Sequence, residues 1–257
     1  MRYGFHLSIQ KGLLGSLEEA QQLGLSTFQI FVQNPRAWSS NPPSPKVIEA
    51  FRATRENLEL PVVAHASYLI QLEAQGELAQ KSVFSLAEQL QRAGLLGLEG
   101  VVVHAPGRDR EALQAHLEAA LRLAQGLRVP LLLENTAQGS LEALVPLLSD
   151  PRLGLCLDTC HAFAEGLRPL EALALIRERG ALGRLKVIHL NDSQGELGSH
   201  LDRHAHLLKG TIGEELGEVL RFPGLQALII LETPRSPEED AYNLAVLKRW
   251  LSQAPAG

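Results

Sequence analysis

The sequence predicts an α/β protein, a single (β/α)8 barrel in which eight parallel strands alternate with helices. Short apolar segments alternate with amphipathic ones, and eight such units fit within 257 residues, an ordinary length for this barrel. Residues 101–103 and 131–133 are continuously apolar, which is typical of parallel strands buried on both faces. A hydrophobic fraction of 45% and a charged fraction of 21% indicate a globular protein with a sizeable core.

Short apolar runs bounded by turn residues define the expected strands. In chain order they are residues 3–7, 27–32, 62–65, 100–104, 131–134, 154–158, 186–190 and 227–232. A doubly wound open sheet is the main alternative. Such a sheet usually has a glycine-rich phosphate turn after its first strand, and residues 8–12 (SIQKG) lack one.

Helices are expected between the strands. Apolar residues spaced by three and four positions predict helices through residues 79–93 and 113–124. Residues 16–19 (SLEE) are interpreted as a capping box that opens the first helix. Long loops are expected at 39–45 and 193–213, and residues 254–257 are expected to fray. No linker divides the chain, so residues 1–257 are expected to form one domain.

Composition excludes several classes of protein. The chain has no run of 18 or more apolar residues, which a membrane-spanning helix needs, and its N-terminus lacks a signal-peptide pattern. A cytoplasmic chain is therefore expected. Cys156 and Cys160 are too few to staple a fold of this size and are expected to be reduced thiols. The formal net charge of -5 argues, at face value, against a polyanionic partner.

Metal-ligating residue types end six consecutive predicted strands. These residues are His65, His104, Glu134, Asp158, His189 and Glu232. In a barrel these strand ends meet at the C-terminal face, where barrel enzymes place their active sites. One such residue alone is usually only a capped or solvated side chain. Six in succession predict a metal site at this face.

Three further candidates follow the strands. His161 lies three residues after Asp158, and Asp202 and His204 are two apart, so both can point the same way in an extended segment. Imidazoles and carboxylates together suit zinc, manganese or ferrous iron, and the absence of thiolate ligands disfavours a structural zinc site. Nine ligands are too many for one ion and suit two or three.

The motifs around these residues resemble the endonuclease IV family of apurinic/apyrimidinic (AP) endonucleases. The matching segments are residues 65–70 (HASYLI), 134–137 (ENTA), 154–161 (GLCLDTCH), 188–194 (IHLNDSQ), 198–204 (GSHLDRH) and 231–234 (LETP). The resemblance runs from about Gly4 to Pro234, almost the whole chain. It implies a TIM-barrel enzyme of DNA base excision repair.

The resemblance also implies three bound divalent ions. Zn²⁺ is the expected metal, with Mn²⁺ or Fe²⁺ as alternatives at some sites. The implied ligands are His65, His104 and Glu134 for one ion, Glu134 (bridging), Asp158, His189 and Glu232 for a second, and His161, Asp202 and His204 for a third. The four carboxylates among them are counted in the net charge of -5, which three divalent ions would change to about +1. With three ions counted, the net charge no longer argues against DNA as a partner.

The implied reaction is hydrolysis of the phosphodiester bond 5′ of an abasic site in double-stranded DNA. It leaves a 3′-hydroxyl and a 5′-deoxyribose phosphate, and removal of 3′ blocking groups is also expected. Glu134 or Glu232 is expected to handle the proton of the attacking water, and the resemblance does not decide between them. A monomer suffices for this chemistry.

The resemblance places DNA contacts at Arg36, Tyr68 and Leu69. By residue type alone, Tyr68 and Leu69 would be interpreted as a buried loop anchor. Two departures from the family pattern affect neighbouring loops: Gln71 stands where asparagine is usual, and Leu208 where glycine is usual. The second departure puts the geometry of its loop in doubt, because glycine allows a close approach of the backbone.

The other histidines have less specific interpretations. His6 is expected to support the site, to contact DNA or to be a satisfied core residue, and His116 is expected on a solvated helix face. His200 and His206 flank the third ligand group, but the two-residue step from Asp202 favours His204.

Two rival functions remain. Glu134, Asp158, His189 and Glu232 alone resemble the site of a single-metal sugar isomerase or epimerase on the same barrel. The five additional ligand candidates have no role in such an enzyme. A non-catalytic sensor of DNA lesions is the second rival, and the complete ligand set argues against it.

Overall fold

Eight parallel strands close into a barrel in the computed structural model, which describes residues 1–124, 126 and 129–253. The strands are β1 (Tyr3–Leu7), β2 (Phe28–Phe31), β3 (Val62–His65), β4 (Val101–His104), β5 (Leu131–Glu134), β6 (Leu153–Asp158), β7 (Leu185–His189) and β10 (Leu228–Leu231). Neighbours around the barrel follow the chain, and β10 pairs with β1 to close it. The predicted barrel is confirmed and the open sheet is excluded. The expected fraying of residues 254–257 lies outside the described residues.

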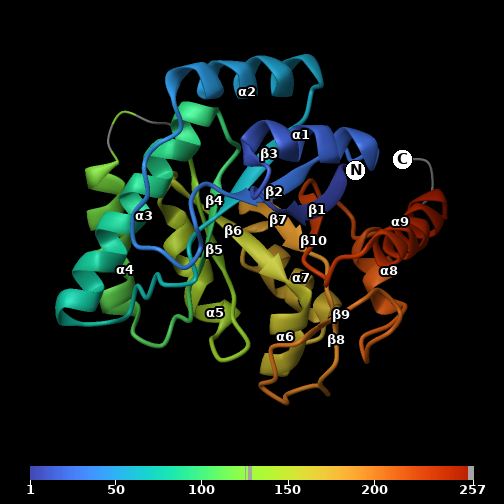
Figure 1. Cartoon of the computed structure of the whole chain (residues 1–257). Coiled ribbons are helices and arrows are strands. Elements are labelled where there is room, and N and C mark those ends of the chain that lie inside the picture. Colours follow the sequence, from blue (N-terminus) through green and yellow to red (C-terminus); the bar gives the residue numbers. More distant parts are fainter. Residues whose placement is uncertain (125, 127–128, 254–257) are drawn as a thin grey trace.

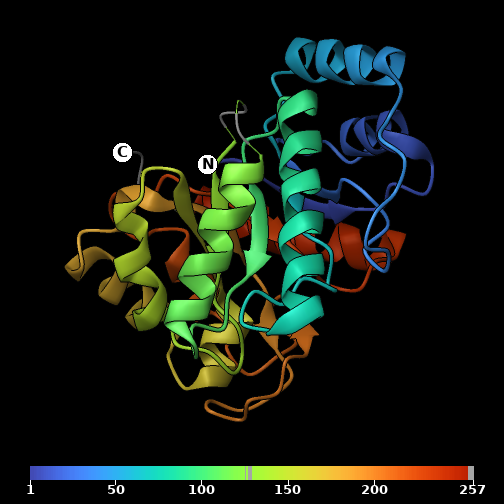
Figure 2. The same ribbon diagram turned by 90° about the vertical axis from the view of Figure 1, so that its left-hand side faces the viewer.

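Helices surround the strands on all sides (Figures 1 and 2). They are α1 (Gly12–Gln22), α2 (Pro45–Asn57), α3 (Gly76–Leu96), α4 (Arg110–Leu123), α5 (Leu141–Leu144), α6 (Thr159–Glu165), α7 (Pro169–Glu178), α8 (Glu215–Val219) and α9 (Pro237–Ser252), with 3₁₀ turns at Val145–Ser149 and Leu182–Arg184. The helices predicted through residues 79–93 and 113–124 correspond to α3 and α4. The outward side chains of the strands pack against these helices and form the main core.

Alternation along the strands explains how the barrel carries both a core and a polar mouth. A small apolar cluster fills the barrel interior and consists of Val63, Val102, Leu132, Cys156, Val187 and Ile230. Because side chains two residues apart share a face of a strand, the next inward position lies at the C-terminal end of each strand. Those positions are His65, His104, Glu134, Asp158, His189 and Glu232. The strand period therefore delivers all six predicted ligands to one mouth.

Two local predictions were wrong. The first helix begins at Gly12 rather than after Ser16, whose hydroxyl donates to the Leu13 carbonyl at 2.7 Å inside the helix. Burial of the face that includes Leu13 favours the longer helix over the predicted capping box. His116 is half-buried rather than solvated, because its ring bonds the Leu72 carbonyl at 2.7 Å, in the segment between β3 and α3.

The segment predicted as a long loop at 193–213 contains a short antiparallel hairpin of β8 (Asp192–Ser193) and β9 (His204–Ala205). The buried carboxylate of Asp192 accepts backbone N–H groups of Gly210 and Ile212, which fixes the return of this segment. Leu208 has a φ of 64°, in the left-handed region that glycine favours. The segment thus holds leucine in the conformation for which the family pattern has glycine.

Among the described helices, none combines the length and apolar character needed to cross a bilayer.

Gly4 marks the tightest contact between β1 and β2. A Cβ added at Gly4 would lie 1.7 Å from the backbone oxygen of Thr27, so the two segments would have to separate. We expect Gly4→Ala to lower the free energy of unfolding by about 3 kcal/mol or more, measured by urea denaturation. Gly183→Ala is the matched control, because an added Cβ there meets nothing within 4 Å. Equal losses in the two variants would contradict this account.

Candidate metal centre

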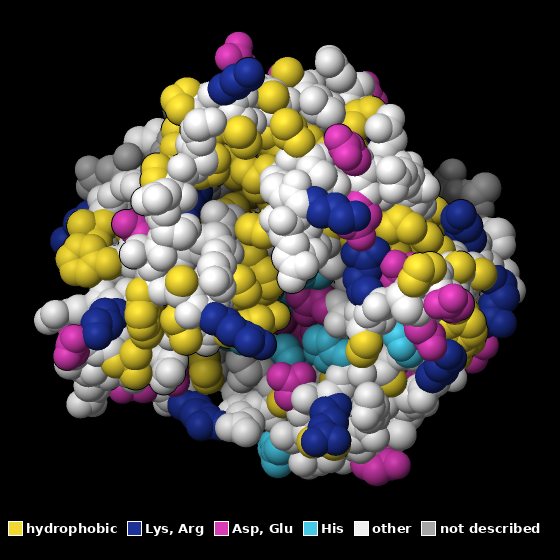
Figure 3. Space-filling model, viewed as in Figure 1, with side chains coloured by type: hydrophobic (Ala, Val, Ile, Leu, Met, Phe, Trp, Pro, Cys, Tyr) yellow, Lys and Arg dark blue, Asp and Glu magenta, His cyan; other side chains and the backbone are white. Residues whose placement is uncertain are grey.

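The mouth of the barrel contains a cavity of about 430 Å³. Figure 3 looks into this face and shows acidic and histidine side chains gathered in a central hollow. The lining residues are His6, His65, Tyr68, His104, His161, Asp202, His204, Glu232, Thr233 and Arg235. All nine candidate ligands lie in or directly beneath this cavity, in three groups whose ligand atoms are each within 4.8 Å of one another.

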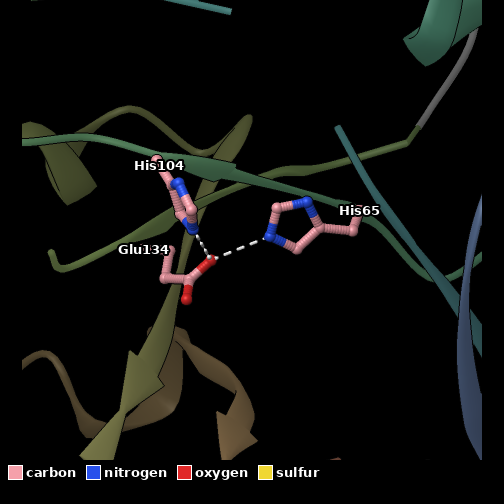
Figure 4. A group of neighbouring side chains, drawn as sticks. All are labelled: His65, His104 and Glu134. Carbon is pink, nitrogen blue, oxygen red and sulfur yellow. Dashed lines mark hydrogen bonds and ion pairs between the residues drawn. The ribbon is translucent and has the colours of Figure 1, made fainter. Parts of the chain in front are cut away.

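The first group joins the ends of β3, β4 and β5 (Figure 4). One carboxylate oxygen of Glu134, Oε2, lies 3.2 Å from His65 Nε2 and 3.3 Å from His104 Nε2. The two imidazoles thus approach the same oxygen from neighbouring strands. The three ligand atoms, His65 Nε2, His104 Nε2 and Glu134 Oε2, therefore face one common point.

The second group extends from the other oxygen of Glu134. Glu134 Oε1 lies 3.0 Å from His189 Nδ1, which is also 3.2 Å from Glu232 Oε2 and 3.9 Å from Asp158 Oδ2. Three carboxylates therefore converge on one imidazole nitrogen at the ends of β5, β6, β7 and β10. Since the two oxygens of Glu134 face different groups, this residue has the geometry of a bridging ligand.

The third group lies between α6 and the hairpin of β8 and β9. Asp202 Oδ1 is 3.2 Å from His161 Nε2 and 3.6 Å from His204 Nε2. His204 Nε2 is buried and has no hydrogen-bond partner among the described residues. His161 belongs to this group because Asp158 caps α6 by accepting its backbone N–H at 2.8 Å, which turns the first helical turn toward the mouth.

The charges of the cluster are unbalanced in favour of the carboxylates. Burial opposes ionisation of Glu134 and Glu232, yet the surrounding histidines hold the pKa of both carboxyls below the ordinary range. Burial also opposes protonation of His161 and His189, but the neighbouring acidic groups raise the pKa of both rings well above the ordinary value. A buried cluster that attracts protons so strongly is one that divalent cations can neutralise.

Four of the five rings that a metal would use have their other nitrogen hydrogen-bonded, which is the usual arrangement around a bound metal. Backbone carbonyls bond the Nδ1 atoms of three histidines: Ala66 O to His65 at 2.7 Å, Asn135 O to His161 at 2.9 Å and, more weakly, Glu232 O to His204 at 3.4 Å. His189 instead bonds through Nε2 to the Gln29 side chain at 2.9 Å. The free nitrogens therefore face the three groups, and the donor set fits divalent ions.

Of the three predicted DNA contacts, Tyr68 lines the mouth, Arg36 lines a neighbouring hollow and Leu69 follows Tyr68 in the chain. Tyr68 is 60% exposed, and its ring centre is 5.8 Å from that of His65. The interpretation of Tyr68 as a buried anchor, based on residue type, is therefore wrong. Leu69 is half-buried beside it, while Arg36 and Gln71 are exposed.

His200, His206 and the two cysteines are the other possible ligands near the third group and the barrel interior. His200 bonds Ala137 O at 3.0 Å and His206 lies 3.5 Å from Glu239, so of these three neighbouring histidines only His204 joins the ligands within the described structure. Cys156 and Cys160 are free and buried, and burial raises the pKa of both thiols to about 12. Cys156 Sγ lies within 4.8 Å of ligand atoms of Glu134 and His189, and Cys160 Sγ within 4.8 Å of ligand atoms of Asp158 and His204, so both side chains pack against the cluster.

Three residues at the site were not predicted. Gln29 bonds His189 and Glu232, Asn191 donates to Asp158 at 2.8 Å, and Arg235 lines the cavity. A signal for Gln29 existed: it is a polar residue inside an otherwise apolar strand, in the segment Phe28-Gln29-Ile30. Asn191 and Arg235 lie just after strands, where polar residues are too common to stand out.

Comparisons with known proteins find relatives along nearly the whole chain. The family model described as a xylose isomerase-like TIM barrel matches residues 17–252. Endonuclease 4 from one strain of Thermus thermophilus is 52% identical over 98% of this chain and 99% of the relative. The crystal structure of endonuclease IV from another strain of Thermus thermophilus is 50% identical and has a TM-score of 0.94, with coverage of 99% of this chain and 100% of that one.

A D-tagatose 3-epimerase-like protein covers 98% of the chain and 97% of its own, at 20% identity and a TM-score of 0.73. At this identity the likeness shows the shared barrel alone. The high identity over nearly the full length is to endonuclease IV, and so the chain belongs to the endonuclease IV family, the AP endonucleases of base excision repair.

Proposed function

We propose that the three groups bind three divalent ions, with zinc as the first expectation, and that the protein incises double-stranded DNA 5′ of abasic sites. The observation that carries this proposal is the position of Glu134, whose two oxygens face two separate ligand groups. A shared carboxylate between groups is the arrangement of a multinuclear centre, and a single-metal epimerase needs only one group. Manganese or ferrous iron could replace zinc at some sites.

The proposed ligands follow the three groups. They are His65, His104 and Glu134 for the first ion, Glu134, Asp158, His189 and Glu232 for the second, and His161, Asp202 and His204 for the third. Bound ions would lower the pKa of a coordinated water and neutralise charge on the phosphate oxygens. The barrel strand ends hold the ligands of the first two groups, while α6 and the segment up to β9 supply those of the third.

Glu232 is better placed than Glu134 to take the proton of the attacking water. Glu134 is fully buried and is not among the residues that line the cavity. The side chain of Glu232 is 15% exposed and lines the cavity from which water enters. We therefore assign proton transfer to Glu232, while Glu134 joins the first two groups. Glu134 and Glu232, the two catalytic carboxylates predicted from the sequence, therefore have different roles in this proposal.

A second hollow of about 1170 Å³ adjoins the mouth and gives the DNA strand a path. His6 and Arg235 line both hollows, and the loop that carries Arg36 also lines the second. Tyr68 lines the mouth, and Leu69 follows it in the chain. Side chains at these positions can fill the space left by the missing base while the abasic sugar enters the mouth. Since one chain forms the whole site, we propose that a monomer is active.

The test is incision of a duplex that contains one tetrahydrofuran abasic analogue. We expect a single nick 5′ of the analogue that leaves a 3′-hydroxyl, and no nick when a chelator is present. Metal analysis of the same preparation should give three ions per chain. One ion per chain would favour the epimerase alternative, and tight binding to the duplex without a nick under any divalent metal would favour the lesion sensor.

A further inference from the structure

One inward side chain at the mouth has an arrangement of contacts that the ligand groups do not account for. Gln29 is completely buried in β2, yet its side-chain amide bonds three residues of the mouth. We propose that Gln29 is a positioning residue that sets which atoms of His189 and Glu232 face the second group. This inference rests on the proposed function, because it assumes that the second group binds an ion.

The amide oxygen orients His189. Gln29 Oε1 lies 2.9 Å from His189 Nε2, and only a protonated Nε2 can donate to it. The lone pair of His189 is thereby left on Nδ1, the nitrogen that faces the carboxylates of the second group. Backbone carbonyls perform this task for His65, His161 and His204, so among these histidines only His189 depends on a side chain.

The amide nitrogen orients Glu232. Gln29 Nε2 donates to Glu232 Oε1 at 2.7 Å, which leaves Oε2 as the oxygen that lies 3.2 Å from His189 Nδ1. Two ligands of one group, on β7 and β10, are thus held by a single amide on β2. A substitution that removes this amide would release both ligands together.

His6 keeps the amide from rotating. Gln29 Nε2 lies 2.9 Å from His6 Nδ1 as well as 2.7 Å from Glu232 Oε1, so its two N–H groups have two acceptors when His6 carries its proton on Nε2. Rotation by 180° would place the amide oxygen against both acceptors and the amide hydrogens against the His189 N–H. Contacts to both the oxygen and the nitrogen of the Gln29 amide therefore fix its orientation. The side-chain identity, and not only its volume, determines the geometry of the second group.

Gln29→Met tests the proposal, because methionine has a similar length and no polar hydrogens. The buried N–H of His189 loses its acceptor, and Glu232 Oε1 loses its donor. Loss of such outer contacts typically weakens metal binding about 10- to 100-fold. We expect Gln29→Met to need about 10- to 100-fold more free zinc than the wild type to fill one of its sites, measured as zinc per chain in chelator-buffered solutions.

Gln33→Met is the matched control. Gln33 is also buried and follows the same strand, and it loses comparable contacts to Ala37 O and Arg92, but it touches no candidate ligand. We expect its zinc binding to equal that of the wild type. In the cobalt-substituted proteins, the visible absorption should change for Gln29→Met and stay unchanged for Gln33→Met.

His189→Ala separates the two hypotheses. If His189→Ala keeps every ion of the wild type, the proposed metal function of the second group is wrong. If His189→Ala loses an ion while Gln29→Met binds zinc as tightly as the wild type, the positioning role is wrong. Thermal unfolding of the metal-free proteins completes the test, because a positioning residue predicts a folded apoprotein. Failure of both Gln29→Met and Gln29→Leu to fold would assign Gln29 to the core and overturn the proposal.

Discussion

Glu134→Gln is expected to reduce kcat/KM for abasic-site incision by about 1000-fold or more, a loss of about 4 kcal/mol in transition-state stabilisation. The substitution keeps the volume of the side chain but replaces one anionic oxygen by an NH₂ group. Since Oε2 faces His65 and His104 and Oε1 faces His189, either orientation of the amide points hydrogens at ring nitrogens of one group. One of the first two groups therefore loses its shared ligand in any rotamer.

Metal content should change in parallel with activity. We expect Glu134→Gln to retain the ion of the third group and to lose at least one of the other two, measured by elemental analysis after dialysis. Glu165→Gln is the matched control, because Glu165 is a half-buried carboxylate on α6 that belongs to none of the three ligand groups. A Glu134→Gln protein with full metal content and wild-type kcat/KM would refute the bridging role.

The strand ends could be predicted from the sequence because two periodicities coincide. A buried strand shows as a short apolar run, and the period of two places its last residue on the same face as the apolar interior residue before it. His104 and Val102 illustrate this rule, since both point into the barrel. The barrel fold then brings strand ends together that are far apart along the chain. Neither step requires knowledge of loop conformations.

What the sequence could not supply were contacts made between elements. Ser16 is of a residue type that often caps helices, but the preceding turn is packed as part of the helix, which therefore begins earlier, at Gly12. His116 looks solvated by its position on α4 until the Leu72 carbonyl of another segment is in place. Gln29 is conspicuous as a polar residue in a strand, but its role depends on His189 and Glu232, which are remote in sequence. Such contacts arise from tertiary structure and leave little local pattern.

Removal of the metals is expected to weaken DNA binding as well as cleavage, because the charge of the mouth would change sign. The four candidate carboxylate ligands, Glu134, Asp158, Asp202 and Glu232, carry four negative charges. Without metal, the acidic neighbours raise the pKa of His161 and His189 well above the ordinary value and that of His65 above it, so protonated rings offset part of this charge. With two of these rings protonated, the apo-cluster carries about two negative charges. Three divalent ions would displace these protons and give about two positive charges, a change of about four.

This change can be converted into an affinity. At about 6 Å in water, one unit charge interacts with a phosphate by about 0.7 kcal/mol, and physiological salt screens this to about half. A change of about four charges is then worth about 1.3 kcal/mol for each phosphate in reach, or about tenfold in Kd. With the two phosphates that flank the abasic sugar, we expect Kd to rise about 100-fold in chelator.

Fluorescence anisotropy can measure this effect separately from cleavage if the duplex carries a phosphorothioate at the incision position. The metal-loaded protein and the chelated protein are compared at equal ionic strength, and circular dichroism checks that the chelated protein stays folded. An undamaged duplex is the control, because its phosphates stay outside the mouth and its Kd should change far less. Equal affinity for the abasic duplex with and without metal would show that the predicted DNA contacts, Arg36, Tyr68 and Leu69, provide the binding energy. The charge of the metal centre would then serve catalysis alone.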